Sequence, residues 1–175
     1  MQQQFYNYKR QPVDLVQHCF EQRAIHGQDL TVFIGTDSIS VGGKIHYFIV
    51  VAFRYGKNGV HFIYAKEKVP TYRFENGKPD IDTKLRREGH MTMDLAKFLV
   101  DSNIFTKDQI IVEFDYNDAI PTVSTRLIPE MKGLATWFGY QSLTKYGEYV
   151  LTQNLEEVTD QIAVKAANHL CQGVS

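Results

Sequence analysis

With 175 residues, the chain has the length of one folding unit whose core is large enough to fold alone. The formal net charge is −1 and the isoelectric point is about 6.6, so no overall basic field would attract a polyanion. A nucleic-acid partner would therefore need a local basic patch or bound cations. No apolar run is long enough to cross a bilayer, and "MQQQFYNYKR" at the start lacks the apolar segment of a signal peptide.

The two cysteines, Cys19 and Cys171, match no metal-binding spacing. Reduced thiols in a cytoplasmic protein are the simpler interpretation, and a single disulfide bond is the alternative. We therefore expect one cytoplasmic domain over residues 1–175, without a membrane partner.

The first half of the chain predicts a helix followed by three strands. Apolar residues recur at helical spacing over 12–27, between Pro12 and Gly27. Strands are predicted over 30–36, 44–55 and 60–69, and the hairpin signal Asn58-Gly59 makes the last two antiparallel. His46 and His61 lie on this hairpin, but such a turn places neither opposite the other, so we propose no zinc site there.

The second half predicts alternating helices and strands. An amphipathic helix is expected over 81–103, a strand within 108–118 and a helix over 124–140 that tolerates Pro129 and closes at Gly139. A short strand around 140–143 and a last helix over 154–170, with Asn154 as N-cap, complete the core of residues 30–171. This order predicts an α/β fold, a mixed five-stranded sheet with helices on both faces and an extra N-terminal helix.

Acidic residues stand at distinctive places in this layout. Asp37 ends the first strand, Glu88 lies in the helix after the meander, Asp115 ends the fourth strand, and Asp160 lies in the first turns of the last helix. Taken singly, each has a structural explanation: a turn residue for both strand ends, an ion pair of Glu88 with Lys84, and a favourable helix dipole for Asp160.

The combination of these acids indicates a function more strongly than any one of them does. If the first and fourth strands are neighbours, Asp37 and Asp115 meet at one edge, where packed helices can add Glu88 and Asp160. Clustered carboxylates repel one another unless divalent cations neutralise them, and oxygen-only ligands select Mg²⁺ or Mn²⁺ rather than zinc. Two such ions about 4 Å apart can activate a water molecule and stabilise the leaving oxygen of a phosphodiester.

The segments "IGTDSIS", "RREGHMTMDLAKFL", "IIVEFDYND" and "EEVTDQIAVKAA" together resemble the ribonuclease H-like superfamily. Within it, "GTDS", "KLRREGHMTMDLA" and "STRLIPEMKGLATWFGY" are most similar to the YkuK-type family of predicted bacterial and phage nucleases, over roughly residues 32–163. The chain departs from the family pattern at Lys145-Tyr146, where Lys-Pro is expected, and at Gln161, where lysine is usual.

The resemblance implies a metal-dependent nuclease acting on RNA, an RNA–DNA hybrid or DNA. Asp37 would bridge two Mg²⁺ or Mn²⁺ ions, Glu88 and Asp115 would each hold one, and Asp160 would complete the second site. The alternative is an inactive relative that binds nucleic acid or a protein partner. Tyr116 is expected either to stack on a base or to pack in the core.

Basic residues near the acids are candidates for phosphate contacts, although a solvated helix face explains them equally well. These residues are Lys84, Arg87, Arg126, Lys145 and Lys165.

Overall fold

The computed structural model describes residues 3–56, 59–116, 123–144 and 162–174. Among these residues, no helix combines the length and the apolar character needed to cross a membrane. The strands are β1 (Phe5–Asn7), β2 (Pro12–Val13), β3 (Leu30–Val41), β4 (Lys44–Tyr55), β5 (Val60–Pro70), β6 (Ile110–Phe114) and β7 (Gln141–Thr144). The helices are α1 (Leu15–His26), α2 (Ile81–Asp101), α3 (Val123–Phe138) and α4 (Ala163–Gln172), with short 3₁₀ turns η1 (Gly27–Asp29) and η2 (Lys107–Gln109).

The strands form one mixed sheet in the order β2-β1-β5-β4-β3-β6-β7. Strands β3, β4 and β5 make the expected antiparallel meander, and β6 and β7 run parallel to β3. The α/β class and the mixed sheet are confirmed, but the described residues alone give the sheet seven strands rather than the expected five.

The two unexpected strands, β1 and β2, lie at the β5 edge of the sheet. With three and two residues they are too short to show an alternating pattern, so their pairing is decided by contact with β5. Pro12 belongs to β2 and not to the first helix, which begins later than expected. The N-cap is Asp14, whose carboxylate accepts a hydrogen bond from the Gln17 backbone N–H at 2.8 Å.

The hairpin register also differs from the expectation. His61 lies opposite Phe53 and His46 opposite Lys68, so the turn is not the two-residue one that Asn58-Gly59 suggests. His61 instead meets His18 of α1, with the two Nε2 atoms 2.9 Å apart.

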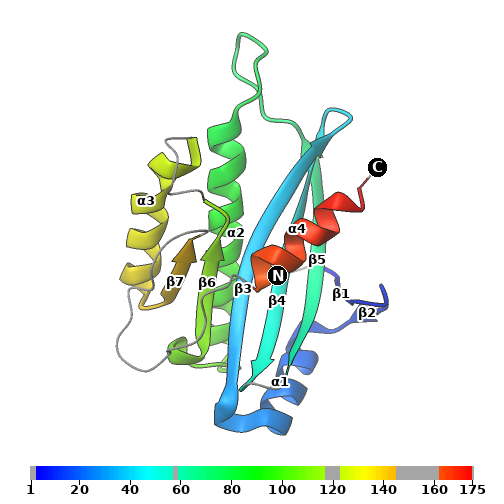
Figure 1. Ribbon diagram of the computed structural model, residues 1–175, viewed down its shortest axis with the longest axis vertical. Helices are drawn as coiled ribbons and strands as arrows, with labels where there is room; N and C mark the ends of the chain where they lie inside the picture. The colour runs from blue at the N-terminus through cyan, green and yellow to red at the C-terminus, as the bar shows by residue number, and fades with distance from the viewer. Residues whose placement is uncertain (1–2, 57–58, 117–122, 145–161, 175) are drawn as a thin grey trace.

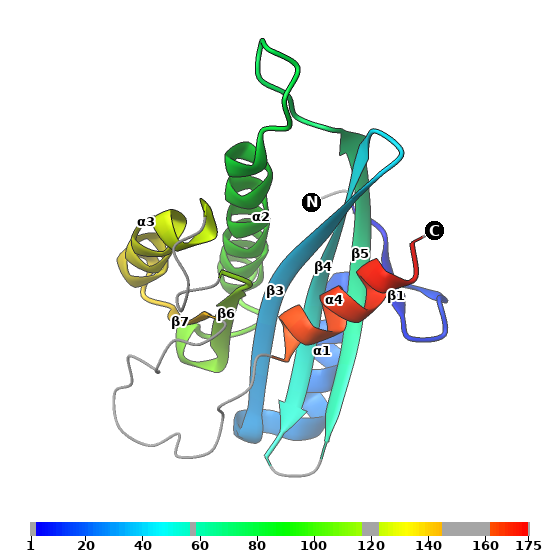
Figure 2. The ribbon, with the colours of Figure 1, turned by 45° about the horizontal axis from the view of Figure 1, so that its top comes forward.

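Helices cover both faces of the sheet (Figures 1 and 2). Residues from α1, α2 and α3 pack on one face, in a core that includes Val32 and Ile34 of β3. Helix α4 crosses the other face and packs on Phe33. Because Cys19 belongs to the first core and Cys171 to the second, the sheet separates the two cysteines, and both are free thiols.

The later helices agree in part with their predictions. Helix α3 contains Pro129 and ends before Gly139, whose φ of +78° is the left-handed conformation that stops a helix. Helix α4 follows the second half of the predicted last helix. The first half of that prediction, with Asn154, lies outside the described residues.

Strand β6 is much shorter than its neighbour β3, and among the described residues no strand pairs with β3 beyond Thr36 on that side. The prediction that Asp37 ends the first strand is wrong, because Asp37 pairs with Phe48 inside β3. The register pairs Thr36 with Phe114, the last residue of β6, whereas β3 continues to Val41. We call the space beyond the end of β6, between β3 and α2, the notch.

Candidate functional site

Asp37 and Asp115 lie beside each other at the notch. Each is one residue beyond the last paired residues of β3 and β6, Thr36 and Phe114. Residues level with each other on parallel neighbouring strands point to the same face, so the two carboxylates are directed alike. Both side chains are partly buried. The prediction that the first and fourth strands are neighbours is confirmed.

Glu88 approaches the notch from α2 and is 3% exposed. The Ser38 hydroxyl donates a hydrogen bond to Glu88 Oε1 at 2.5 Å. Lys84 Nζ lies 3.9 Å from the same oxygen and donates to the Ser38 carbonyl at 3.0 Å. The ion pair with Lys84, which was the structural explanation for Glu88, therefore exists, but the carboxylate is also fixed against β3.

The acids act on one another electrostatically. Burial, and then the negative charge of Asp115, raises the pKa of Asp37. Burial also raises the pKa of Glu88 to about 8, and the charges of Asp37 and Asp115 add to the effect of burial although Ser38 and Lys84 oppose it. Asp37, Glu88 and Asp115 are therefore close enough to affect one another's charge, and we call these residues the acid cluster.

Packing behind the acid cluster holds the chain after β6 against α2. The buried Tyr116 hydroxyl donates to the Leu85 carbonyl at 2.7 Å. A Cβ on Gly89 would lie 2.8 Å from that hydroxyl and 2.5 Å from Met131 Sδ, so only glycine allows this contact. Tyr116 is thus a packing residue, which decides between the two alternatives for it and fixes Asp115 close to Glu88.

The donor set of the acid cluster fits a cation that prefers oxygen ligands. The pKa of Asp37 and that of Glu88 are raised, and a bound cation would neutralise the negative charges that repel one another. Their positions are less favourable. Within the described ranges, no group of three His, Cys, Asp or Glu side chains is placed to hold one metal ion.

Asp160, the fourth predicted acid, and Lys145 lie outside the described residues. In the described part of α4, Cys171 lies close enough to Asp37 for each group to affect the pKa of the other. Burial and the Asp37 charge raise the pKa of the Cys171 thiol. The neighbour of Asp37 on this helix is therefore a neutral group.

Glu113 is a buried acid that the sequence analysis did not single out. It is 0% exposed, and its two carboxylate oxygens accept from the backbone N–H groups of Ile162 at 2.7 Å and Val164 at 2.8 Å. Burial raises the pKa of Glu113 to about 7, although these bonds oppose the rise.

Glu113 thus caps the N-terminus of α4, where a helix has unpaired N–H groups and a positive dipole end. Gly35, its partner across the strands, lets α4 approach, since a Cβ there would lie 2.8 Å from Val164 Cγ2. The available signal was a single carboxylate inside the apolar run "IIVEF".

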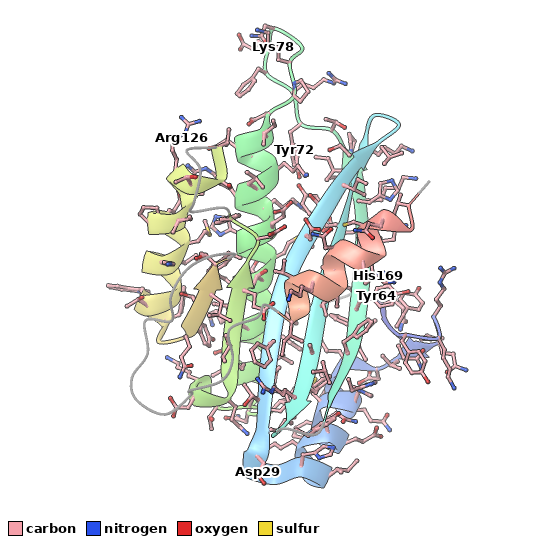
Figure 3. All side chains as sticks on the ribbon, in the orientation of Figure 1. Asp29, Tyr64, Tyr72, Lys78, Arg126 and His169 are labelled. Atoms are coloured by element: carbon pink, nitrogen blue, oxygen red, sulfur yellow. The ribbon has the colours of Figure 1, made fainter. Side chains whose placement is uncertain are left out.

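Two of the five predicted phosphate-binding residues, Arg87 and Lys84, are engaged with protein groups. Arg87 pairs with Glu67 at 2.5 Å and lies over the ring of Tyr47, and Lys84 contacts Ser38 and Glu88. Arg126 is exposed on α3 (Figure 3), and Lys165 is exposed on α4. Their contact with nucleic acid stays a prediction.

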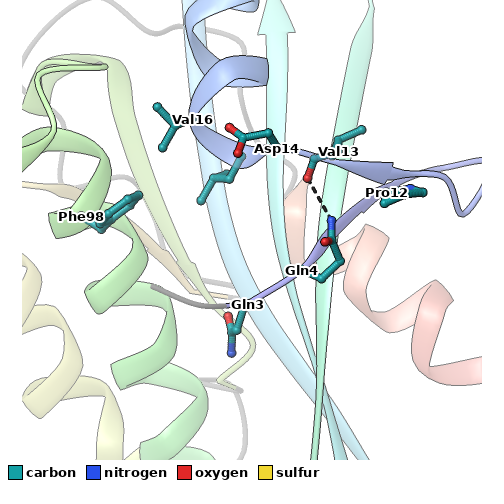
Figure 4. A pocket seen from close by; sticks show the side chains of 8 residues that line it. Gln3, Gln4, Pro12, Val13, Asp14, Val16 and Phe98 are labelled. Carbon is teal, nitrogen blue, oxygen red and sulfur yellow. Dashed lines mark hydrogen bonds between the residues drawn. The ribbon is translucent and has the colours of Figure 1, made fainter.

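A pocket of about 350 Å³ lies apart from these acids, between the N-terminal strands and α2 (Figure 4). Gln4 Nε2 donates to the Val13 carbonyl at 3.2 Å at its edge, and Phe98 of α2 closes the opposite side. Its acid, Asp14, already caps α1. The pocket therefore offers no convergent reactive groups.

Comparison with models of protein families, with curated proteins and with solved structures finds no match to the chain.

Proposed function

We propose that the protein is a divalent-metal-dependent nuclease that hydrolyses phosphodiester bonds in RNA or DNA, by a two-metal-ion mechanism of the ribonuclease H type. The observation that carries the proposal is the convergence of Asp37, Glu88 and Asp115 from three separate elements on the notch. The meander, the parallel fourth strand and the helix bearing Glu88 also match the element order of that superfamily.

The acid cluster has the donor atoms and the negative charge that a cation site requires. Burying a carboxylate and placing it near two others both cost free energy in the folded protein, and the pKa of Glu88 is raised mainly by burial and further by the charges of Asp37 and Asp115. Asp37, Glu88 and Asp115 would hold Mg²⁺ or Mn²⁺. When bound, such ions supply Lewis-acid activation of water and of the leaving oxygen.

Residues around the cluster orient it. Ser38 and Lys84 hold the Glu88 carboxylate toward β3, and Tyr116 anchors the chain beside Asp115. Ser38 lies on β3 and Lys84 on α2, so rigid elements hold the Glu88 carboxylate, and the Tyr116 hydrogen bond ties the chain after β6 to α2.

Asp37→Asn and Asp115→Asn test the proposal. The purified protein is incubated with labelled single-stranded RNA, single-stranded DNA and RNA–DNA hybrid, with Mn²⁺ or with EDTA. We expect cleavage with Mn²⁺, none with EDTA, and a loss on the order of a thousandfold for each variant. Cleavage that survives both substitutions would contradict the proposal.

An inactive binding module is the second candidate, and one observation favours it. Glu88 Oε1 already has a hydrogen bond from Ser38 and an ion pair with Lys84, and no three donors among the described residues are placed for one ion. Titration calorimetry separates the candidates: the nuclease takes up Mn²⁺ and Asp37→Asn does not, whereas the binding module takes up none.

A further inference from the structure

A group of lysines lies on the sheet face that carries Asp37. Lys66 and Lys68 alternate along β5, and Lys44 begins β4. All three side chains are exposed, so α4, which covers part of this face, leaves them open to solvent. We call Lys44, Lys66 and Lys68 the lysine patch.

The strand register places the lysine patch relative to Asp37. Asp37 pairs with Phe48, and Phe48 pairs with Lys66, so these three residues form one row across the sheet. Paired residues point to the same face. Strands lie about 4.8 Å apart, so the Cα atoms of Asp37 and Lys66 are roughly 10 Å apart.

The next rows carry the other lysines. Ile39 pairs with His46, and His46 pairs with Lys68, while Lys44 lies two residues before His46 on the same strand. The patch therefore surrounds His46. It extends from the row of the acid cluster toward the end of the sheet that β3 and β4 reach at their hairpin.

The charge of the patch is not neutralised from within the described structure. Among the described residues, none of these lysines forms an ion pair with an acid, and Lys66 lies 5.2 Å from the ring centre of Phe48. The nearest acid in the sequence, Glu67, points to the opposite face and binds Arg87.

His46, which lies among the three lysines, provides a second observation on the charge of the lysine patch. It is 7% exposed and its Nδ1 has no hydrogen-bond partner. Burial lowers its pKa, and the charges of Lys66, Lys68 and Lys44 lower it further, with no acid opposing them. This part of the sheet therefore has a concentrated positive potential in a chain whose net charge is −1.

We propose that the lysine patch is the phosphate-binding surface that leads a single nucleic-acid strand across β5 and β4 to the acid cluster. The inference names the substrate-binding surface of the proposed nuclease and rests on that function. Ammonium groups bind phosphates as point charges without reading the bases, so the surface has no sequence preference. An acidic polypeptide is the rival occupant.

Binding is measured without cleavage, by fluorescence anisotropy of a labelled single-stranded oligonucleotide in EDTA. The test variant is Lys44→Gln/Lys66→Gln/Lys68→Gln. The matched control, Lys97→Gln/Lys107→Gln/Lys132→Gln, removes the same charge from α2, η2 and α3. Circular dichroism checks that both variants are folded.

We expect the test variant to lose at least about tenfold in affinity and the control to change by less than about twofold. The slope of log K against log salt should fall by about 2, since each phosphate contact contributes about 0.7 on a single strand. A triple Lys→Arg variant should retain the wild-type affinity.

Equal weakening of test and control variants would overturn the inference, as would unchanged affinity of the test variant or no binding by the wild type. Polyglutamate that competes as strongly as an unlabelled oligonucleotide at equal charge would also overturn it. Loss of binding through the patch in a protein that cleaves nothing would support the inference and contradict the nuclease proposal. Normal cleavage and binding by the test variant would contradict the inference and support the nuclease proposal.

Discussion

Among the described residues, two glutamates are buried almost completely, and their surroundings differ. Glu113 accepts hydrogen bonds from the first turn of α4, so its carboxylate oxygens have partners that tie β6 to this helix. Glu88 has one hydroxyl and a distant lysine, and two aspartates repel it. Burial raises the pKa of both. The difference in partners assigns Glu113 to structure and Glu88 to a site.

The largest expected effect tests the Glu88 side of this comparison. Glu88→Gln keeps the size and the acceptor for Ser38 but removes the charge. We expect cleavage to fall on the order of a thousandfold. In EDTA at neutral pH, the free energy of unfolding should stay equal or rise by up to about 3 kcal/mol, because a repelled buried charge is lost.

Cleavage rates and urea unfolding, measured on the same preparation of Glu88→Gln, check the expected changes in activity and in the free energy of unfolding. A large loss of stability with unchanged cleavage would place Glu88 among the structural residues, beside Glu113.

Glu113→Gln should show the opposite pattern. An amide cannot accept from all of the α4 N–H groups, and its own NH₂ faces them, so we expect a loss of about 2–4 kcal/mol in the free energy of unfolding. Cleavage per folded molecule should change little. Glu75→Gln, in an exposed turn, serves as control and should stay within about 0.5 kcal/mol of the wild type.

Gly35→Ala sharpens the comparison by disturbing the Glu113 cap without touching the carboxylate. The new Cβ would lie 2.8 Å from Val164 Cγ2 and 3.1 Å from Val164 N, so α4 must shift. We expect a loss of about 1–3 kcal/mol in urea unfolding. In Gly133→Ala, on α3, the Cβ meets nothing within 4 Å, and a gain of up to about 1 kcal/mol is expected.

The smallest effect concerns a buried titratable pair that avoids charge. Burial lowers the pKa of His18 and of His61 below the ordinary 6.5. The unfolded chain therefore takes up protons at higher pH than the folded one, and stability falls as the pH drops through 6.5.

His61→Gln should reduce the fall in unfolding free energy between about pH 7.5 and about pH 5.5, whereas His90→Gln, at an exposed position of α2, should not. An identical fall in both variants would show that other groups cause the pH dependence.

Most elements of this fold were predictable, because each is long enough to show its own periodicity. Helix α2 and strands β4 and β5 follow their apolar patterns closely, whereas β3 continues to Val41 beyond its predicted end at Thr36. The pairing of β3 with β6 brings Asp37 and Asp115 level, and Glu88 joins them through the packing of α2 on β3. The strand pair β1 and β2 was not predictable, since so few residues carry no pattern.

The sequence by itself determined the α/β class, the order of the elements from α1 to β7 and the three acids of the candidate site. Only the tertiary structure decided that Glu113 caps α4, that Arg87 is paired with Glu67 and that the lysine patch shares a face with Asp37. The physical reason is the separation along the sequence of the residues that decide each property. Periodicity and end residues are local properties of the chain, whereas the partner of a charge depends on the register that brings distant strands and helices into contact.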